Sequence, residues 1–339
     1  MDFEISATQQ AVVDVATSVL DKDISWTAMV DGGLTALPVP ERLGGDGLGM
    51  AEVATLLTEV GRHGAVTPVF ATLGLALVPL LDSASVEQQD RYLADVAGGA
   101  VLTAALNEAG SALPDHPSVT LRDGRLSGTK IGVPVADDAR WMLVTAEDTV
   151  VVICPQSPGV RLIRTPTSNG LAEYTVVFDD VVVDGADVLA GVAPRRINQL
   201  VLAMSGAYAD GLVAGALRLT ADYVAGREQF GKPLSTFQTV AAQLAEIYIA
   251  SRTIDLAAKA VVWALDAGVE CDADLDVLGY WITSQAPPVM QLCHHLHGGM
   301  GMDISYPMHR YYSTIKDLTR MLGGPSHRLD LVGAQCSSI

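Results

Sequence analysis

Residues 226–238 read GREQFGKPLSTFQ, a stretch in which an Arg, a Lys and two amide side chains surround a Gly-Lys-Pro turn. The whole chain carries a formal net charge of −18, so its long-range field repels phosphate groups. A phosphate-bearing ligand must therefore be met by a local cluster of donors, and this turn supplies one. The stretch predicts an anion site in an otherwise acidic protein.

The composition indicates a protein of two or three packed units. The chain has 339 residues, 49% of them hydrophobic, which is more than one compact core usually holds. Thirty-nine acidic against 21 basic residues argue against nucleic acid or an anionic membrane as a partner. The longest nearly uncharged apolar run, LGLALVPLL at 73–81, is shorter than the roughly 20 residues that span a bilayer. The N-terminal residues MDFEISATQQ show no secretory signal, so we expect a cytoplasmic protein.

The pattern along the chain predicts an α+β fold of three parts. Residues 1–103 predict an N-terminal α-helical domain, with Ser6 and Gln9 as a capping box before the first helix. Residues 104–192 contain short β-rich runs separated by turns, and they predict a middle β domain, an antiparallel barrel or sandwich. Residues 193–339 predict a C-terminal four-helix bundle, with helical segments at 195–226, 235–268, 273–297 and 307–322.

Metal chemistry finds little support in the sequence. The four cysteines, Cys154, Cys271, Cys293 and Cys336, lack the spacing of a disulfide framework or a zinc knuckle. The bundle has no Glu-x-x-His pair of the kind that binds di-iron centres. Cys293 and His297 lie four residues apart on one helix face, but a histidine-rich helix end explains them as well as a ligand pair does. We predict no metal site.

The order of the segments carries more information than any one of them. A Gly-rich PERLGGDGLG follows the first helices, a β region ends in FDDVVVDGADVLAG, and GREQFGKPLSTFQ and HLHGGMGMDISYPMHRYY lie in the bundle. This order resembles the acyl-CoA dehydrogenase family along nearly the whole chain, and residues 227–238 match the family's RxxFGxPxxxxQ pattern. The resemblance implies the family's fold, a FAD cofactor and α,β-dehydrogenation of an acyl-CoA thioester.

The resemblance also assigns residues to the FAD. In the family, the Arg, Phe and distal Gln of this pattern, with a Gln-x-x-Gly-Gly stretch, reach across a dimer interface to FAD bound mainly by the neighbouring subunit. The corresponding residues are Arg227, Phe230, Gln238, His295, Gly298 and Gly299, with His295 in place of the Gln. An Arg offers a bidentate fork to a diphosphate, and backbone N–H groups left free by the glycines suit the same charge. Alternatively, Arg227 caps the preceding helix.

The part of the family's site that holds the flavin ring is altered here. Family members usually have Thr-Glu-Pro followed by Gly-Ser-Asp, and later Gly-Thr-Lys-x-Trp-x-Thr. This chain reads LNEAGSALPDHP and GTKIGVP, with Asn107 for Thr, Ala109 for Pro, Ala112 for Asp, Gly132 for Trp and Pro134 for Thr. Gly and Pro cannot pack on a flavin or hydrogen-bond to it as Trp and Thr do. The resemblance therefore implies a ring site that this chain does not use.

The family's catalytic base is missing as well. Removal of the α-proton needs a carboxylate, which most relatives place in a Tyr-Glu-Gly-Thr stretch; here that stretch is residues 322–325, LGGP. Other relatives carry it at the position of Val201. Glu228 and Glu246 remain, but charges on solvated helix faces are the simpler interpretation. We assign no catalytic residue to this chain.

We therefore expect one subunit of a heteromeric enzyme whose homologous partner supplies the ring site and the catalytic Glu. Such pairs resemble the α2β2 acyl-CoA dehydrogenases of actinobacteria that oxidise steroid-CoA thioesters, including those from the cholesterol side chain. The resemblance implies two flavins per tetramer and electron transfer flavoprotein as the acceptor. Two alternatives stay open: a homomeric dehydrogenase with an unusual base, and a non-catalytic scaffold.

Overall fold

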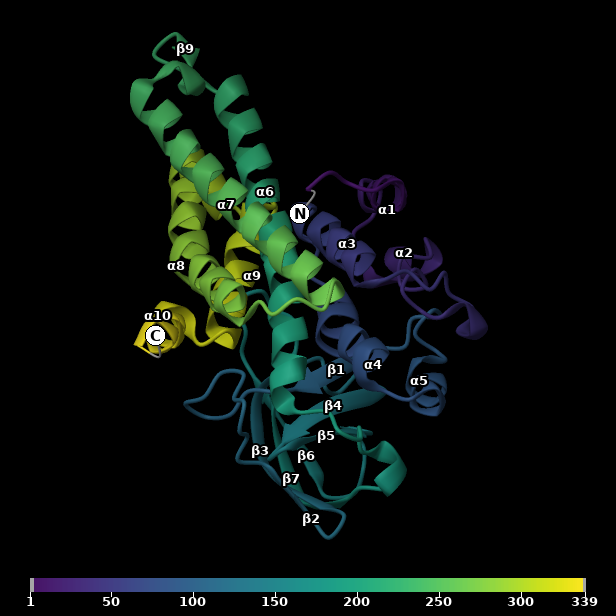
Figure 1. The fold of residues 1–339 in the computed structure, drawn as a ribbon. Coiled ribbons are helices and arrows are strands. Elements are labelled where there is room, and N and C mark those ends of the chain that lie inside the picture. The colour runs from purple at the N-terminus through teal and green to yellow at the C-terminus, as the bar shows by residue number, and fades with distance from the viewer. Residues whose placement is uncertain (1–2, 338–339) are drawn as a thin grey trace. The chain divides into compact units, whose positions relative to one another are not determined.

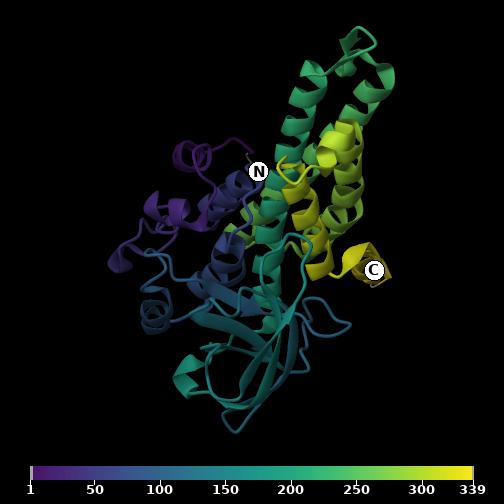
Figure 2. The ribbon, with the colours of Figure 1, turned by 180° about the vertical axis from the view of Figure 1, so that it is seen from behind.

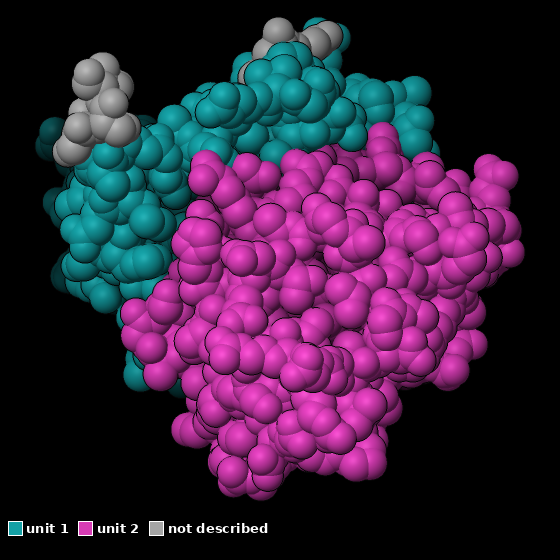
Figure 3. All heavy atoms as spheres, turned by 60° about the horizontal axis from the view of Figure 1, so that its bottom comes forward, with its two compact units in different colours: residues 1–24, 55–66, 205–339 teal, residues 25–54, 67–204 magenta. Residues whose placement is uncertain are grey.

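The computed structural model describes residues 3–337 and forms two compact units. Unit 1 comprises residues 1–24, 55–66 and 205–339, and unit 2 comprises residues 25–54 and 67–204 (Figure 3). The units interleave along the sequence because α3 and α6 each contribute residues to both. The three-part division at residues 103 and 192 follows the chain in a different way and stays a prediction.

The first hundred residues are helical, as the sequence predicts. Ser6 and Gln9 form the expected capping box, in which the Ser6 hydroxyl accepts from the Gln9 N–H and the Gln9 side chain accepts from the Ser6 N–H. A second box, Ser85 with Gln88, begins α5. The helices are α1 (Ala7–Leu20), α2 (Trp26–Asp31), η1 (Glu41–Leu43), α3 (Met50–Arg62), the π-helix η2 (Phe70–Leu77), α4 (Val78–Ser83) and α5 (Val86–Leu93).

The middle of the chain folds into two sheets within unit 2 (Figure 1). The three-stranded sheet has the order β1 (Leu102–Ala105), β4 (Trp141–Ala146), β5 (Thr149–Ile153). The four-stranded sheet has the order β2 (Thr120–Arg122), β3 (Arg125–Pro134), β7 (Glu173–Val182), β6 (Val160–Thr165). Strand β1 pairs with β4 in parallel, which differs from the purely antiparallel expectation. A long connection, residues 106–140, separates these two strands and makes the parallel pairing feasible.

A shared apolar core holds the two sheets together. Alternate side chains of the three-stranded sheet, such as Met142 and Val144, and of the four-stranded sheet, such as Val176 and Phe178, belong to one buried cluster. Alternation along each strand directs these residues toward the other sheet. The other face of the four-stranded sheet is partly exposed, whereas the strands of the three-stranded sheet are buried on both faces. The arrangement is that of a sandwich.

The C-terminal region is a bundle of long helices. Its helices are α6 (Pro194–Gly226), α7 (Gln238–Asp266), α8 (Asp272–His297), α9 (Met308–Met321) and α10 (Gly324–Ser337), the last of which the sequence did not predict. Figures 1 and 2 show α7, α8 and the unit 1 part of α6 running side by side. Among the described residues, α6 alone has the length and hydropathy of a membrane span, but 89% of its most apolar window is buried. This burial is typical of a core helix.

Glycines bring α3 and α6 into close contact within unit 1. A Cβ atom added at Gly211 would lie 2.0 Å from the Thr58 carbonyl oxygen, and one at Gly215 would lie 2.2 Å from the Arg62 carbonyl oxygen. The Thr58 hydroxyl donates to the Ala207 carbonyl at 3.0 Å across the same contact. Only glycine fits at these two positions, so the contact fixes the C-terminal half of α3 on α6.

Candidate functional site

The stretch 226–238 folds into a small hairpin between α6 and α7 (Figure 1). Strands β8 (Glu228–Gln229) and β9 (Lys232–Pro233) pair antiparallel around Phe230 and Gly231, whose φ angles are 55° and 76°. Two consecutive positive φ angles are typical of the type I′ turn that matches hairpin twist. The Leu234 N–H donates to the Arg227 carbonyl at 2.8 Å and closes the base of the hairpin. We call residues 226–238 the hairpin arm.

Phe230 occupies this turn at an unusual place for an aromatic residue. Its side chain is 92% exposed, and its positive φ is unfavourable for a residue with a Cβ. The ring makes an edge-to-face contact with Phe237, with centroids 6.2 Å apart. The ring is therefore accessible to another molecule.

Two further residues of the assigned set lie on the hairpin arm, and both are exposed: Arg227 and Gln238. The Arg227 N–H donates to the Tyr223 carbonyl at 2.9 Å, as the end of α6 requires. Its guanidinium makes no hydrogen bond or ion pair with any residue between 3 and 337, so it does not cap α6. This cation is therefore available to a group outside residues 3–337.

The N-terminus of α7 adds positive potential to the arm. The residue before the helix is Phe237, which offers no side-chain cap. The nearby Thr236 hydroxyl donates to the Pro233 carbonyl instead. The first N–H groups of this 29-residue helix therefore lack a side-chain acceptor, and a helix N-terminus favours an anion.

The second assigned stretch, the glycine turn at residues 295–299, ends α8. His295 is exposed, and Gly298 has φ 57° and ψ −137°. The prediction that Gly298 leaves its N–H free is wrong, because that N–H donates to the His294 and His295 carbonyls and closes the helix. A Cβ atom at Gly298 or Gly299 would meet nothing within 4 Å, so the backbone there stays open to a ligand.

The hairpin arm and the glycine turn together fit a diphosphate. The arm offers an uncommitted guanidinium and an uncapped helix N-terminus, and both are exposed. Cβ atoms added at Gly226 and Gly231 would also meet nothing within 4 Å. Exposed donors with open space around them are the chemistry that a diphosphate requires.

The ring-side segment, residues 106–134 of unit 2, differs because it contains a buried ion pair, Lys130 with Glu108. Lys130 is 0% exposed, and its Nζ lies 3.0 Å from the Leu106 carbonyl, 3.0 Å from Thr145 Oγ1 and 2.8 Å from Glu108 Oε1. The Glu108 carboxylate also accepts from the backbone N–H groups of Ser118 and Val119, at 2.7 and 3.1 Å. Every charge of this pair is therefore satisfied inside the unit.

The pKa values of the pair follow from this burial. Desolvation lowers the pKa of Lys130 to about 8, against the opposing effect of Glu108. Burial alone would raise the pKa of Glu108, but the hydrogen bonds from Lys130 and Ser118 outweigh it and hold the pKa below its usual value. The pair is ionised at neutral pH.

Asn107 and Asn198 hold the loop of the ring-side segment in place. Asn107 Oδ1 accepts from the Leu113 N–H at 2.8 Å, and the Asn198 amide donates to the Leu113 and Pro114 carbonyls at 2.9 and 3.1 Å. Leu113 itself has φ 47°, a strained value that these bonds maintain. Asn107 Oδ1 is thus engaged by the loop, and Gly132 has no side chain to offer a flavin ring.

Neither place where relatives carry the base offers a carboxylate. Val201 is 0% exposed within α6, and Leu322 is 0% exposed at the end of α9. The Leu322 carbonyl accepts from Nε of Arg328, which is itself 3% exposed. Glu228 and Glu246 are both exposed, as the solvated-face interpretation expects.

A buried carboxyl that the sequence analysis missed is Asp210, in the unit 1 part of α6. It is 5% exposed, and burial, reinforced by the charge of Asp255, raises its pKa to about 7. It interrupts an otherwise uncharged run at 197–217, and that interruption was the available signal.

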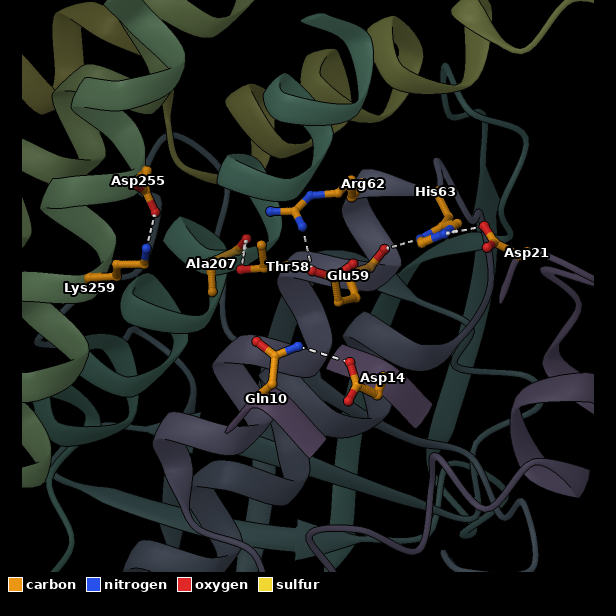
Figure 4. A network of polar contacts seen from close by, with 10 residues as sticks. All are labelled: Gln10, Asp14, Asp21, Thr58, Glu59, Arg62, His63, Ala207, Asp255 and Lys259. Atoms are coloured by element: carbon orange, nitrogen blue, oxygen red, sulfur yellow. Dashed lines mark hydrogen bonds and ion pairs between the residues drawn. The ribbon is translucent and has the colours of Figure 1, made fainter. Parts of the chain in front are cut away.

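Asp210 faces a network of charges, part of which Figure 4 shows. Arg62 pairs with Glu59 at 2.6 Å, and Asp255 pairs with Arg252 at 2.6 Å and with Lys259 at 2.8 Å. Asp255 itself is only 6% exposed. The network places charges of α3, α6 and α7 around one buried carboxyl, so we assign it to structure.

Cys293 and His297, the two candidate metal ligands, have environments that do not require a metal. Burial raises the pKa of the Cys293 thiol to about 11, which disfavours the thiolate that binds metals. The His297 nitrogens face the Cys293 carbonyl at 2.8 Å and the Tyr306 hydroxyl at 3.0 Å. Within the described part of the chain, no group of three or more His, Cys, Asp or Glu residues could hold a metal ion.

Comparison with known proteins identifies relatives of this architecture. Sequence profiles of the acyl-CoA dehydrogenase N-terminal and C-terminal domains match residues 4–100 and 202–334. Acyl-CoA dehydrogenase FadE28 of Mycobacterium tuberculosis (strain ATCC 25618 / H37Rv) is 71% identical over 337 residues, 99% of each chain.

Solved structures agree with the sequence matches. A chain in the crystal structure of the ChsE4-ChsE5 complex from Mycobacterium tuberculosis has a TM-score of 0.91 at 26% identity, covering 100% of both chains. A chain of the Tcur3481-Tcur3483 steroid ACAD G363A variant has a TM-score of 0.90 at 30% identity, covering 97% of this chain and 98% of that chain. These likenesses confirm the predicted α+β fold, with N-terminal helices, a middle sheet region and C-terminal helices.

Proposed function

Because the chain belongs to the acyl-CoA dehydrogenase family, we propose that it is one subunit of a heteromeric, FAD-dependent acyl-CoA dehydrogenase whose partner carries the catalytic base. The reaction is α,β-dehydrogenation of an acyl-CoA thioester. One observation carries the proposal: the Arg227 guanidinium is exposed without a partner among residues 3–337, while Gly132 and Pro134 stand where the family has the side chains that hold a flavin ring.

The cofactor is FAD, and this chain holds its diphosphate end. When bound, FAD supplies the acceptor for the hydride that leaves the β-carbon. Arg227 neutralises diphosphate charge with its guanidinium fork, and the N-terminus of α7 at Gln238 adds backbone donors. Phe230 covers the bound nucleotide with its exposed ring. Gly299, together with His295 and Gly298, presents open backbone to the same ligand.

The partner subunit, a homologue of this chain, completes what is missing here. A flavin ring requires polar contacts and an aromatic wall that residues 106–134 do not offer, so the ring lies against the partner. The α-proton requires a carboxylate, which the partner supplies because Val201 and residues 322–325 offer none. A closed α2β2 assembly then contains one complete site for each pair of unlike chains.

The substrate class follows from relatives and not from a pocket. One similar structure is a complex of two named chains, ChsE4 and ChsE5, and another is described as a steroid ACAD. The second of these supports a steroid-CoA thioester as the substrate, and we propose one from the cholesterol side chain. Electron transfer flavoprotein is the proposed acceptor, and the cytoplasm is the proposed location.

The first experiment is to purify the chain alone and together with a homologous partner that has an intact Thr-Glu-Pro segment and a placed Glu. The chain alone should be colourless, and the pair should be yellow and bleach when an acyl-CoA is added. A yellow preparation of the chain alone that bleaches with an acyl-CoA would show a homomeric dehydrogenase and contradict the proposal.

A second experiment separates this subunit role from that of a scaffold. Arg227→Ala in the purified pair should weaken FAD binding by about tenfold to a hundredfold, the usual effect of losing a charge-assisted contact. Arg161→Ala is the matched control, since Arg161 is equally exposed but lies on β6 in unit 2. Unchanged FAD affinity in Arg227→Ala would favour the scaffold.

A further inference from the structure

The imidazole of His297 joins the glycine turn to the helix that leads into the hairpin arm. His297 is the last residue of α8, and it is 2% exposed. Its ring stacks on Tyr223 of α6, with centroids 4.5 Å apart and an interplanar angle of 25°. The Tyr223 carbonyl accepts from the Arg227 N–H, so the stacked residue lies one helical turn before the Arg.

Both ring nitrogens of His297 are engaged, and their roles can be assigned. Nδ1 lies 2.8 Å from the Cys293 carbonyl, which can only accept, so Nδ1 carries the proton. Nε2 then accepts from the Tyr306 hydroxyl, 3.0 Å away. Burial lowers the pKa of His297 by more than the Cys293 and Leu219 carbonyls raise it, which keeps the ring neutral. The imidazole has one orientation, fixed at both nitrogens and on one face.

We propose that His297 is a positioning residue for FAD, which holds the glycine turn and Arg227 at the separation that the diphosphate requires. The inference rests on the proposed function of the hairpin arm and extends it to a residue that does not touch the ligand. At 2% exposure, His297 can act only through its neighbours. Contacts from two helices bind a rigid diphosphate well only if their spacing is fixed before binding.

The chain contains a matched control for this role in His63. Its Nδ1 lies 2.8 Å from the Glu59 carbonyl four residues earlier, and its Nε2 lies 3.1 Å from Asp21 Oδ1. His63 therefore also has both ring nitrogens engaged within unit 1, although its Nε2 faces a carboxylate, which can only accept, and not a hydroxyl. It lies at the end of α3, which contacts α6 at Gly211 and Gly215, about three to four turns before Arg227.

The test measures the FAD dissociation constant of the purified two-chain complex by equilibrium dialysis, with unfolding temperature recorded in parallel. His297→Phe keeps a stacking ring but loses both hydrogen bonds, and it should weaken FAD binding by about tenfold. Tyr306→Phe removes one hydroxyl and should weaken it by about threefold to fivefold, which gives a second readout if His297→Phe folds poorly. His297→Gln should recover part of the affinity, since an amide both donates and accepts.

His63→Phe should lower the unfolding temperature but change FAD affinity less than about twofold.

A double-mutant cycle separates positioning from general stability. If His297 acts through Arg227, His297→Phe should lose most of its effect in an Arg227→Ala background. Full additivity, or FAD affinity within about twofold of wild type for both His297→Phe and Tyr306→Phe, would overturn the inference. If Arg227→Ala itself leaves FAD affinity unchanged, the proposed function fails first, which distinguishes the two failures.

Discussion

The hairpin arm and the ring-side segment differ in the exposure and the partners of their charged groups. On the arm, the Arg227 guanidinium is exposed without a partner among residues 3–337, and Phe230 stands 92% exposed in a strained turn. In the ring-side segment, Lys130 is 0% exposed and has three acceptors, and Glu108 has three donors. The Arg227 guanidinium therefore still lacks a partner, whereas the Lys130–Glu108 pair has all of its partners within the chain.

The difference shows how a chain can keep half of a cofactor site. A buried polar group needs a partner in every state of the protein, so a pocket that no longer receives a ligand must satisfy its groups internally. An exposed donor has no such cost in free energy, because it hydrogen-bonds to water until a ligand binds. Glu108 and Lys130 are the residues that this chain shares with the family's Thr-Glu-Pro and Gly-Thr-Lys stretches, so the pair alone does not mark a lost flavin contact. The mark of lost contact is the replacement of the neighbouring side chains, Gly132 for Trp and Pro134 for Thr among them.

The largest expected effect on stability lies in the ring-side segment. Lys130→Met leaves the Glu108 carboxylate buried without its cation, which should lower the free energy of unfolding by about 3–5 kcal/mol. Denaturant unfolding of the purified chain measures it. The double variant Lys130→Met/Glu108→Gln should recover part of the loss, and Arg227→Ala on the arm should change stability by less than about 0.5 kcal/mol. If Lys130→Met and Arg227→Ala lowered the free energy of unfolding equally, the contrast between the two regions would be contradicted.

A second prediction concerns the pH dependence that the buried interior imposes. The pKa of Asp210 is about 7 in the folded chain and has a reference value of 3.8, so the folded state binds more protons between these values. Its contribution to stability is therefore complete below pH 4 and is lost as pH rises through about 7. Asp210→Asn should raise the free energy of unfolding at pH 8 by on the order of 2–4 kcal/mol relative to wild type, with little change at pH 4.

Unfolding curves at pH 4, 6 and 8 check this prediction. A stability difference between Asp210→Asn and wild type that stays constant with pH would mean that Asp210 is ionised in the fold, contrary to its burial.

A third prediction compares the same substitution at two glycines. Gly211→Ala places a Cβ against the Thr58 carbonyl at 2.0 Å, which forces α3 away from α6 and should lower stability by about 1–3 kcal/mol. Gly299→Ala meets nothing within 4 Å and has no positive φ to strain, so it should change stability by less than about 0.5 kcal/mol. Thermal unfolding ranks the two variants. A Gly299 variant that is the less stable of the two would show that the glycine turn is packed and not open.

The smallest expected effect on stability belongs to Phe230. Phe230→Asn places a residue that tolerates positive φ in the turn and should change the free energy of unfolding by less than about 0.5 kcal/mol, with a slight gain expected. FAD binding by the two-chain complex should nevertheless weaken. A marked loss of stability in the chain alone would indicate that Phe230 packs within its own chain.

The sequence predicted most of the helices and strands because their signals are local. Capping at Ser6, the turn at Asp123-Gly124 and the apolar periodicity of α7 depend only on nearby residues. It missed β2 (Thr120–Arg122), which is too short for a period, and α10, whose run of mixed polarity shows weak helical spacing. The parallel pairing of β1 with β4 depends on topology, which periodicity does not report.

Prediction of the site was limited in a similar way. Position along the chain placed Arg227, Phe230 and Gln238 on one hairpin and the glycine turn at the end of α8. Burial of Asp210 and Asp255, use of the Gly298 N–H and the contacts of His297 all arise from packing between helices. Such contacts join residues far apart in sequence, so no local sequence pattern predicts them.

The most direct test is the number of FAD molecules in the purified complex of this chain with its homologous partner. Flavin released by denaturation is quantified by absorbance against the amount of each chain. One FAD for every pair of unlike chains is the expected result, because only the site that combines this arm with the partner's ring surface is complete. Two FAD molecules per pair would mean that residues 106–134 also seat a flavin ring, and would contradict the account.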